Sequence, residues 1–327
     1  MAEEVMQRNL ALELVRVTEA AALSAVRMMG RGDKNGADSA AVNAMRQALG
    51  RIDMDGIVVI GEGEKDEAPM LYVGEELGNG RAPRVDIAVD PVDGTRLLSQ
   101  GMPGAIAVVA VAERDTMYSA PPGVYYMQKI IVGPRAKGAI DINKSVADNI
   151  RSVSRALNRD EGDITVMVLD RPRHEQLIAE IRDTGARVSL IPDGDVMGAI
   201  AAADESTTVD MLMGTGGAPE AVIAACAIKA MRGDMQCKLY FRNVTERDNA
   251  VALGVEVNAI YKIDDLVKSN DVFFAATGIT NGELLGGVKI TDNMAFTESV
   301  VMRGKSGTIR YIRAVHPKEK VSNIVES

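Results

Sequence analysis

The sequence predicts an α/β protein of two lobes, and three observations support this prediction. The chain has 327 residues, which is enough for one large domain or two packed lobes. Before residue 50 the apolar residues recur at helical spacing, and short apolar runs of strand length follow them. From about residue 160 onward strands and helices alternate, a pattern typical of a parallel α/β lobe.

The first half of the chain reads as two helices followed by strands. Apolar spacing predicts a long helix over residues 5–29, which ends at Gly30, and a second helix over residues 38–49. We expect Pro91 and Gly94 to end the strand that precedes them. The strands predicted in this half cover residues 56–61, 85–90, 105–111 and 129–132.

The second half alternates between strand and helix. Its strands are predicted over residues 163–169, 187–191 and 209–213, and its helices over residues 173–183, 196–203 and 219–231. The change in pattern predicts an N-terminal α+β lobe, residues 1–150, and a C-terminal α/β lobe, residues 151–327, without a flexible linker. We expect the polar tail after Pro317 to be loose.

The composition excludes several classes of function. The net charge is −9 and no run of Lys and Arg occurs, so neither nucleic acid nor a membrane surface is an expected partner. No apolar run reaches membrane-spanning length and the N-terminus is acidic, so we expect a cytoplasmic protein. With two cysteines and two histidines, a metal site would depend on oxygen ligands, which suit Mg²⁺ and Mn²⁺.

Carboxylates follow the predicted strands or stand near a helix start. Glu62 follows the first strand, Asp90 and Asp93 follow the second, and Asp38 stands near the start of the second helix. Strand ends are where open sheets place ligand groups. Carboxylates that meet there repel one another by about 1 kcal/mol per pair at 4 Å in water, and by more when partly buried. A divalent cation would remove this repulsion.

Each of these residues also has a purely structural interpretation. Asp90 and Asp93 belong to turn-forming dipeptides, and Thr95 could be the N-cap of the helix that follows. Glu62 could be a solvated loop residue. The convergence of these groups on strand ends in one half of the chain favours a metal site.

The segment Asp90-Pro91-Val92-Asp93-Gly94-Thr95, with the acidic Gly-Glu loop upstream, resembles the lithium-sensitive phosphatase superfamily. More specifically, the chain resembles class II fructose-1,6-bisphosphatases from about Arg16 to Lys305. Further matching stretches are residues 30–34, 59–64, 66–72, 191–195 and 216–220.

The resemblance implies the sugar-phosphatase fold, a layered α/β/α/β/α sandwich with a metal-binding first lobe and a substrate-binding second lobe. It implies hydrolysis of fructose 1,6-bisphosphate to fructose 6-phosphate in gluconeogenesis, with Mn²⁺ or Mg²⁺ as cofactor, by a homo-oligomer (a dimer or tetramer). The metal-ligand positions it implies are Asp38, Glu62, Asp90, Asp93 and Glu220. Thr95 matches the catalytic residue that orients the attacking water. The substrate-binding positions it implies are Asp93, Gly94, Thr95, Tyr126, Arg171, Pro172, Arg173, Asp193, Gly194, Asp195 and Gly217.

Two groups of these residues have support from their chemistry alone. Arg171 and Arg173 follow a predicted strand, and guanidinium groups suit a second phosphate, although isolated arginines are more often solvated. Gly217 precedes a predicted helix whose N-terminus could bind an anion, or it forms a tight turn. His174 is expected at a helix start rather than as a base.

The chain departs from the class II pattern at two places. Asp93 stands where most members have Glu, which moves the carboxylate back by one methylene. The segment over residues 121–127 replaces a shorter one, so either Tyr125 or Tyr126 could be the substrate tyrosine. The alternatives to fructose 1,6-bisphosphatase activity are a sedoheptulose-1,7-bisphosphatase or a dual-specificity enzyme, an inositol- or nucleotide-phosphate phosphatase, and a catalytically silent metabolite-binding regulator.

Overall fold

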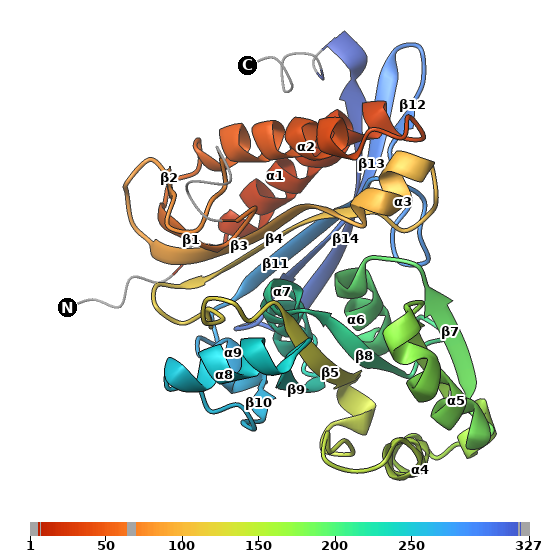
Figure 1. The fold of residues 1–327 in the computed structure, drawn as a ribbon. Coiled ribbons are helices and arrows are strands. Elements are labelled where there is room, and N and C mark those ends of the chain that lie inside the picture. The colour runs from red at the N-terminus through yellow and green to blue at the C-terminus, as the bar shows by residue number, and fades with distance from the viewer. Residues whose placement is uncertain (1–5, 7, 64–69, 320, 322–327) are drawn as a thin grey trace. The chain divides into compact units, whose positions relative to one another are not determined.

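The computed structural model describes residues 6, 8–63, 70–319 and 321. The chain forms two compact units (Figure 1). Unit 1 comprises Met1–Met117 and Ser269–Ser327, and unit 2 comprises Tyr118–Lys268. Each unit contains one mixed sheet with helices packed against it, which confirms the predicted α/β class. Among the described residues, no helix is long and apolar enough to cross a lipid bilayer.

Unit 1 is a mixed sheet with helices on one face. Its strand order is β12-β13-β11-β4-β3-β1-β2, with β14 beside β13. β1 and β3 run parallel, and the other paired neighbours run antiparallel. The helices are α1 (Leu10–Ala25), η1 (Val26–Met28), α2 (Lys34–Leu49) and α3 (Thr95–Gln100). The strands are β1 (Asp55–Ile60), β2 (Glu76–Gly78), β3 (Arg84–Asp93), β4 (Ile106–Glu113), β11 (Phe273–Gly278), β12 (Lys289–Ile290), β13 (Met294–Arg303) and β14 (Thr308–Pro317).

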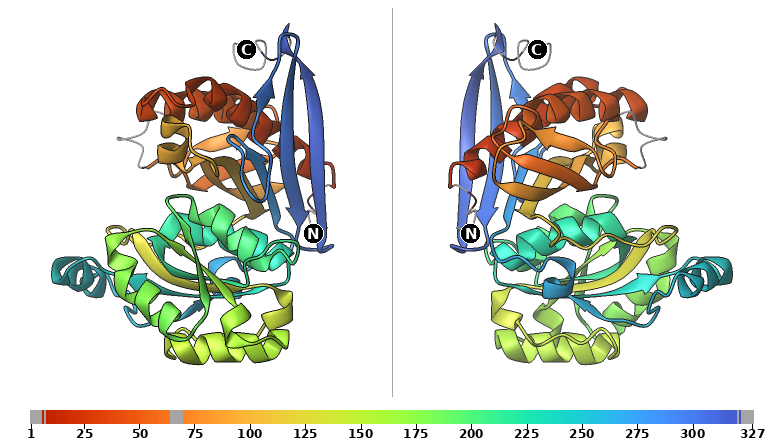
Figure 2. Two further views of the ribbon diagram at one scale, coloured as in Figure 1. Left: turned by 90° about the vertical axis from the view of Figure 1, so that its right-hand side faces the viewer. Right: turned by 90° about the vertical axis from the view of Figure 1, so that its left-hand side faces the viewer.

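The core of unit 1 lies between the sheet and helices α1 and α2 (Figure 2). Leu14 of α1 and Met45 of α2 are fully buried in one cluster with side chains from the central strands, including Ile87, Val109 and Phe273. Because the central strands β3 and β4 are almost fully buried, the residues at their ends are held on a rigid frame.

Unit 2 is a three-layer sandwich. Its strand order is β10-β9-β5-β8-β6-β7, where β7, β6 and β8 run parallel and β5, β9 and β10 are antiparallel to their neighbours. The helices are α4 (Val146–Leu157), α5 (Glu175–Asp183), α6 (Asp195–Ala203), α7 (Ala218–Ala230), α8 (Val244–Ala252) and α9 (Ile263–Leu266), with 3-10 turns η2 (Pro134–Ala136), η3 (Glu161–Asp163) and η4 (Pro172–His174). The strands are β5 (Tyr126–Val132), β6 (Thr165–Leu169), β7 (Arg187–Ile191), β8 (Met211–Gly217), β9 (Asp234–Tyr240) and β10 (Tyr261–Lys262).

The two faces of β5 contact different helices. Ile130 and Val132 are buried in a cluster with α4 and α5. Lys129 points to the other face, as strand geometry requires, and pairs with Asp195 at the start of α6. The face that carries Lys129 is therefore the one on which α6 packs.

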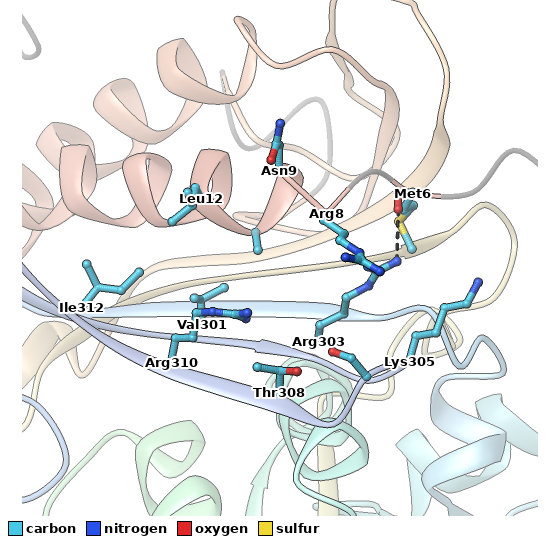
Figure 3. A pocket seen from close by; sticks show the side chains of 12 residues that line it. Met6, Arg8, Asn9, Leu12, Val301, Arg303, Lys305, Thr308, Arg310 and Ile312 are labelled. Atoms are coloured by element: carbon cyan, nitrogen blue, oxygen red, sulfur yellow. Dashed lines mark hydrogen bonds between the residues drawn. The ribbon is translucent and has the colours of Figure 1, made fainter.

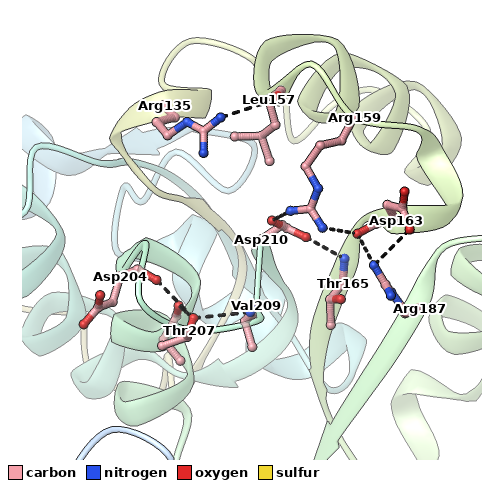
Figure 4. A network of polar contacts seen from close by, with 11 residues as sticks. Arg135, Leu157, Arg159, Asp163, Thr165, Arg187, Asp204, Thr207, Val209 and Asp210 are labelled. Atoms are coloured by element: carbon pink, nitrogen blue, oxygen red, sulfur yellow. Dashed lines mark hydrogen bonds and ion pairs between the residues drawn. The ribbon is translucent and has the colours of Figure 1, made fainter.

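A polar network fixes the beginnings of the parallel strands of unit 2 (Figure 4). Arg159 donates to the carboxylate of Asp210, which accepts from the backbone N–H of Thr165 at 2.9 Å. Arg187 donates to the carbonyl of Asp163 at 2.6 Å. This network lies at the amino ends of β6 and β7, so the carboxyl ends are left for the candidate site.

Three sequence predictions about the elements need correction. The first helix begins at Leu10 rather than residue 5, and residues 1–5 lie outside the described part of the chain. The strand predicted to stop at Pro91 continues to Asp93, because a register shift against β4 between Asp90 and Asp93 accommodates the proline, which lacks an N–H. The second lobe is only partly parallel, because β5 lies antiparallel between β8 and β9.

The predicted lobes and the observed units divide the chain differently. The sequence-based division is a single cut after residue 150, whereas unit 2 begins at Tyr118 and the chain returns to unit 1 at Ser269. The returning segment supplies β11 to β14 of the first sheet.

Candidate active site

The predicted metal-binding residues of unit 1 come from three elements. Asp38 lies on α2, Asp90 and Asp93 lie at the end of β3, and Glu62 follows β1. Because β1 and β3 are parallel neighbours, Glu62, just after β1, and Asp90, near the end of β3, lie at the same edge of the sheet. Glu64 and residues 66–69, which carry part of the family resemblance, lie outside the described residues.

Thr95 and Asp38 are in direct contact. The Thr95 hydroxyl lies 3.2 Å from Asp38 Oδ1 and 3.1 Å from the carbonyl oxygen of Val92, and its single proton can serve one acceptor at a time. Burial raises the pKa of Asp38, and the hydrogen bond from Thr95 opposes this effect. Asp38 is therefore a carboxylate whose charge is incompletely compensated by the protein.

The chain conformation before α3 explains how the Thr95 side chain comes to face Asp38. Gly94 is the N-cap of α3 and has a φ of 93°, a left-handed conformation that favours glycine. Thr95 is the first helical residue, so the alternative in which it caps the helix is wrong. Just upstream, Asp90 Oδ1 accepts a hydrogen bond from the N–H of Val92 at 3.0 Å and closes a turn around Pro91.

The buried carboxylate of Asp93 follows this turn. Its side chain is only 4% exposed, at the last position of β3. The register shift between Asp90 and Asp93 lets both residues lie at the strand end.

In unit 2 the two predicted arginines are fixed by different partners. Arg171 pairs with Asp193 Oδ1 at 2.7 Å and also donates to the carbonyl of Pro192. Arg173 donates from Nε and Nη2 to the carbonyl of Thr215, at 3.1 and 2.6 Å. Neither is a freely solvated surface arginine, which was the structural alternative.

Tyr126, rather than Tyr125, lies against Arg173. The guanidinium carbon of Arg173 is 5.5 Å from the ring centroid of Tyr126, which opens β5 and is half-buried. Tyr125 is 55% exposed and lies under the guanidinium of Arg242. Pro172 lies between the two predicted arginines as the first residue of the 3-10 turn η4.

A buried lysine holds the acidic residues at the starts of α6 and α7. Lys129 Nζ lies 2.5 Å from Asp195 Oδ2, and both side chains are buried. Burial lowers the pKa of Lys129, but the carboxylates of Asp195 and Glu220 raise it, and the net shift is upward. Burial raises the pKa of Glu220, Asp195 raises it further, and Lys129 opposes both effects.

One oxygen of Glu220 has no protein partner in the described part of the chain. Glu220 Oε2 is buried and accepts no hydrogen bond there. Glycines shape the space around it, because a Cβ at Gly217 would lie 1.7 Å from Glu220 Oε2 and one at Gly216 would lie 1.9 Å from Asp195 Oδ2. Gly194, the N-cap of α6, has a φ of 81°. The glycines before α6 and α7 thus leave room for the carboxylates of Asp195 and Glu220 in the first turns of these helices.

His174 has a structural role, as expected. It is buried at the start of α5, where its Nε2 accepts from the backbone N–H of Thr215 at 2.7 Å. A backbone N–H can only donate, so the proton must be on Nδ1, which donates to the carbonyl of Leu169 at 2.7 Å. Burial lowers the pKa of His174.

The five predicted metal ligands are divided between the units, four in unit 1 and Glu220 in unit 2. Within the described ranges, no three His, Cys, Asp or Glu side chains form a group that could hold a metal ion by themselves. The contacts among the predicted residues include those of Thr95 with Asp38, Arg171 with Asp193, and Arg173 with Tyr126.

The sequence analysis missed two residues beside the candidate site. Lys129 could have been noticed as a lone charge within the apolar run of β5. Arg242 lies in a loop, and no motif in the sequence indicates its contact with the two tyrosines.

A separate cavity of about 1250 Å³ lies in unit 1 between the start of α1 and strands β13 and β14 (Figure 3). Arg8, Lys305 and Arg310 line it, as does Arg303, whose guanidinium pairs with Asp271. None of the predicted site residues lines this cavity.

Comparison with known proteins assigns the chain to a family. The family model described as bacterial fructose-1,6-bisphosphatase, glpX-encoded, matches residues 8–316. The chain is 48% identical over 324 residues to the class 2 fructose-1,6-bisphosphatase 1 of Escherichia coli strain K12, covering 95% of this chain and 96% of that protein. The class 2 enzymes of Escherichia coli O6:H1 and Shigella flexneri give the same values. The chain belongs to the glpX-encoded family of bacterial fructose-1,6-bisphosphatases.

Proposed function

We propose that this chain hydrolyses the 1-phosphate ester of fructose 1,6-bisphosphate and releases fructose 6-phosphate and phosphate, as a step of gluconeogenesis. The observation that carries the proposal is the family match over residues 8–316, together with 48% identity to named class 2 enzymes over 95% of the chain. The contact between Thr95 and Asp38 supports the proposal, because it brings together two residues to which the reaction is assigned.

Mn²⁺ or Mg²⁺ is the cofactor that we propose, with Asp38, Glu62, Asp90, Asp93 and Glu220 as its ligands. Two observations support the fit: Glu220 Oε2 is a buried oxygen without a partner among the described residues, and burial raises the pKa of both Asp38 and Glu220. All five donors are carboxylates, which suit hard divalent cations. When bound, such cations would polarise the 1-phosphate and lower the pKa of a water molecule.

Thr95 and Asp38 would orient that water. The Thr95 hydroxyl can donate its proton to Asp38 Oδ1, which leaves its oxygen able to accept a hydrogen bond from water. A water held in this way is positioned for in-line attack on phosphorus.

The residues of unit 2 would bind the rest of the substrate. Arg171 and Arg173 supply cationic groups for the second phosphate, beside the ring of Tyr126. The other substrate-binding positions that we propose are Asp93, Gly94 and Thr95 near the reacting phosphate, and Pro172, Asp193, Gly194, Asp195 and Gly217 around the sugar and second phosphate.

We also propose that the enzyme is a cytoplasmic homo-oligomer, a dimer or tetramer. This rests on the resemblance to class II enzymes, and light scattering of the purified chain tests it. A monomer at the concentrations used for assay would contradict it.

A substrate panel tests the proposed activity. Phosphate release is measured on fructose 1,6-bisphosphate, sedoheptulose 1,7-bisphosphate and inositol 1-phosphate at equal concentration. We expect the highest kcat/KM on fructose 1,6-bisphosphate. Higher kcat/KM on the sedoheptulose ester would retain the chemistry and overturn the substrate. Preference for inositol 1-phosphate would overturn the role of the two arginines.

A further inference from the structure

Two guanidinium groups of unit 2 lie over one tyrosine ring. The guanidinium carbon of Arg173 is 5.5 Å from the ring centroid of Tyr126, and that of Arg242 is 5.8 Å from the same centroid. Arg242 also lies 5.0 Å from the centroid of Tyr125. Both arginines are thus gathered at the start of β5.

The sheet brings these residues together from distant parts of the chain. Tyr126 pairs with Gly217 of β8 on one side and with Tyr240 of β9 on the other. Arg242 follows Tyr240 by two residues, in the short connection between β9 and α8. Arg173 is tied to the same place because its guanidinium donates to the carbonyl of Thr215 in β8.

Both guanidinium groups retain donors for a ligand. Arg173 uses Nε and Nη2, and its Nη1 contacts no acceptor in the described part of the chain. Arg242 uses Nε and Nη2 on the carboxylate of Glu246, and no acceptor for its Nη1 is found among the described residues. Each group therefore has an amino group able to donate to an anion.

The charges at this ring are unbalanced in favour of an anion. Glu246 compensates Arg242, but no carboxylate within the described ranges forms an ion pair with Arg173. Like charges held at one ring repel, and an anion that accepts from both removes the repulsion. Guanidinium groups match the oxygens of a phosphate, and a bound phosphate dianion would restore the balance.

We propose that Arg242 is a specificity-determining residue that binds, together with Arg173, the second phosphate of the sugar bisphosphate beside Tyr126. This rests on the proposed function, in which Arg173 and Tyr126 already contact that phosphate. Arg242 distinguishes bisphosphates from monophosphates, because a substrate without the second phosphate makes no contact with it.

The test compares Arg242→Ala with Arg247→Ala on two substrates. Arg247 is an exposed arginine of α8, the helix that follows Arg242. Its replacement therefore removes the same charge from a nearby position. With fructose 1,6-bisphosphate, we expect Arg242→Ala to raise KM about tenfold with little change in kcat. A tenfold change is at the low end of the effect expected when a hydrogen bond to a charged group is removed. With fructose 1-phosphate, the kcat/KM of Arg242→Ala should match that of the wild type. Arg242→Lys, which keeps the charge without the forked donors, should give an intermediate KM.

Two kinetic results would overturn the inference. One is an equal loss of kcat/KM on both substrates, which would mean that Arg242 only maintains the local structure. The other is an Arg247→Ala variant with the same rise in KM, which would mean that only the overall charge matters.

Calorimetric titration with fructose 6-phosphate separates this inference from the proposed function. If the wild type releases no phosphate from fructose 1,6-bisphosphate, the proposed function fails, and the titration still reads the second-phosphate site. We expect about tenfold weaker binding to Arg242→Ala than to the wild type. Equal affinities, or no binding to the wild type, would contradict the role of Arg242.

Discussion

At the scale of single residues, the candidate chemistry depends on a hydroxyl and a carboxylate that meet where β3 gives way to α3. Thr95 can donate to Asp38 Oδ1, while burial raises the pKa of that carboxyl group. The side chain at position 95 can align a water molecule only if it carries a hydroxyl oxygen that accepts a hydrogen bond.

Replacing Thr95 tests this role. We expect Thr95→Ala to lower kcat by about 100-fold or more, within the range for loss of a positioned proton-transfer group, and to retain Mn²⁺ binding. Thr95→Ser keeps the hydroxyl and should remain within about tenfold of the wild type. Steady-state kinetics and Mn²⁺ titration provide the measurements, and an unchanged kcat in Thr95→Ala would remove this residue from the mechanism.

His174 makes the folded chain sensitive to acid. Burial lowers the pKa of His174 below the value of about 6.5 expected in the unfolded chain. The unfolded chain therefore binds the proton more readily, so the stabilisation from the neutral ring is present above about pH 6.5 and declines as the pH falls below it.

The acid sensitivity predicts a difference between the wild type and His174→Gln. Urea unfolding at a series of pH values from 7.5 to about 5 should show a larger loss of unfolding free energy in the wild type than in the variant. Subtracting the two profiles removes the carboxylates common to both proteins. Parallel profiles would show that His174 does not carry the effect.

At the scale of elements, the candidate site depends on junctions that lack a Cβ or a backbone N–H. Pro91 is accommodated inside β3 by a register shift, which leaves Asp90 and Asp93 at the strand end. Gly217 joins β8 to α7 at the point where Glu220 Oε2 occupies the space that a Cβ would need.

Gly217→Ala tests the second junction. The added methyl group would displace the Glu220 carboxylate, and we expect Mn²⁺ affinity to fall about tenfold or more, as when a supporting contact of a metal ligand is lost. Gly162→Ala is the matched control, because the nearest atom to its Cβ would be 3.7 Å away. Mn²⁺ titration by calorimetry provides the measurement, and wild-type affinity in Gly217→Ala would contradict the placement of Glu220 as a ligand.

Most elements could be predicted from apolar periodicity, but their ends could not. β7 is an exception, because Gly185 before it and Pro192 after it mark the ends that were predicted and observed. α2 begins at Lys34, four residues before the predicted start, because Asp33 caps it by accepting from the N–H of Gly36 at 2.9 Å. A cap of this kind is visible in the sequence, but the Gly-rich segment around it favoured a loop.

At the scale of the whole molecule, the sequence predicts the α/β class but not how the chain is shared between the units. The segment from Ser269 returns to the first sheet, where Phe273 pairs with Val111 and Arg303. Local periodicity carries no information on such distant pairings. For the same reason the pairing of Lys129 with Asp195 was not predicted, since the two residues are distant in sequence.

The family assignment covers the residues of both units, which the contacts within each unit describe separately. The match over residues 8–316 spans the residues of both units. We propose that the carboxylates of unit 1 and the arginines of unit 2 serve a single metal-dependent reaction on a sugar bisphosphate.

The measurement that tests this claim most directly is phosphate release from fructose 1,6-bisphosphate by the purified chain, before and after EDTA and again after Mn²⁺ or Mg²⁺ is restored. We predict turnover that EDTA abolishes and that either cation restores. Turnover that persists in EDTA would contradict the metal-dependent mechanism. If Mn²⁺ binds but no phosphate is released, the chain is a metabolite-binding regulator and not the enzyme described here.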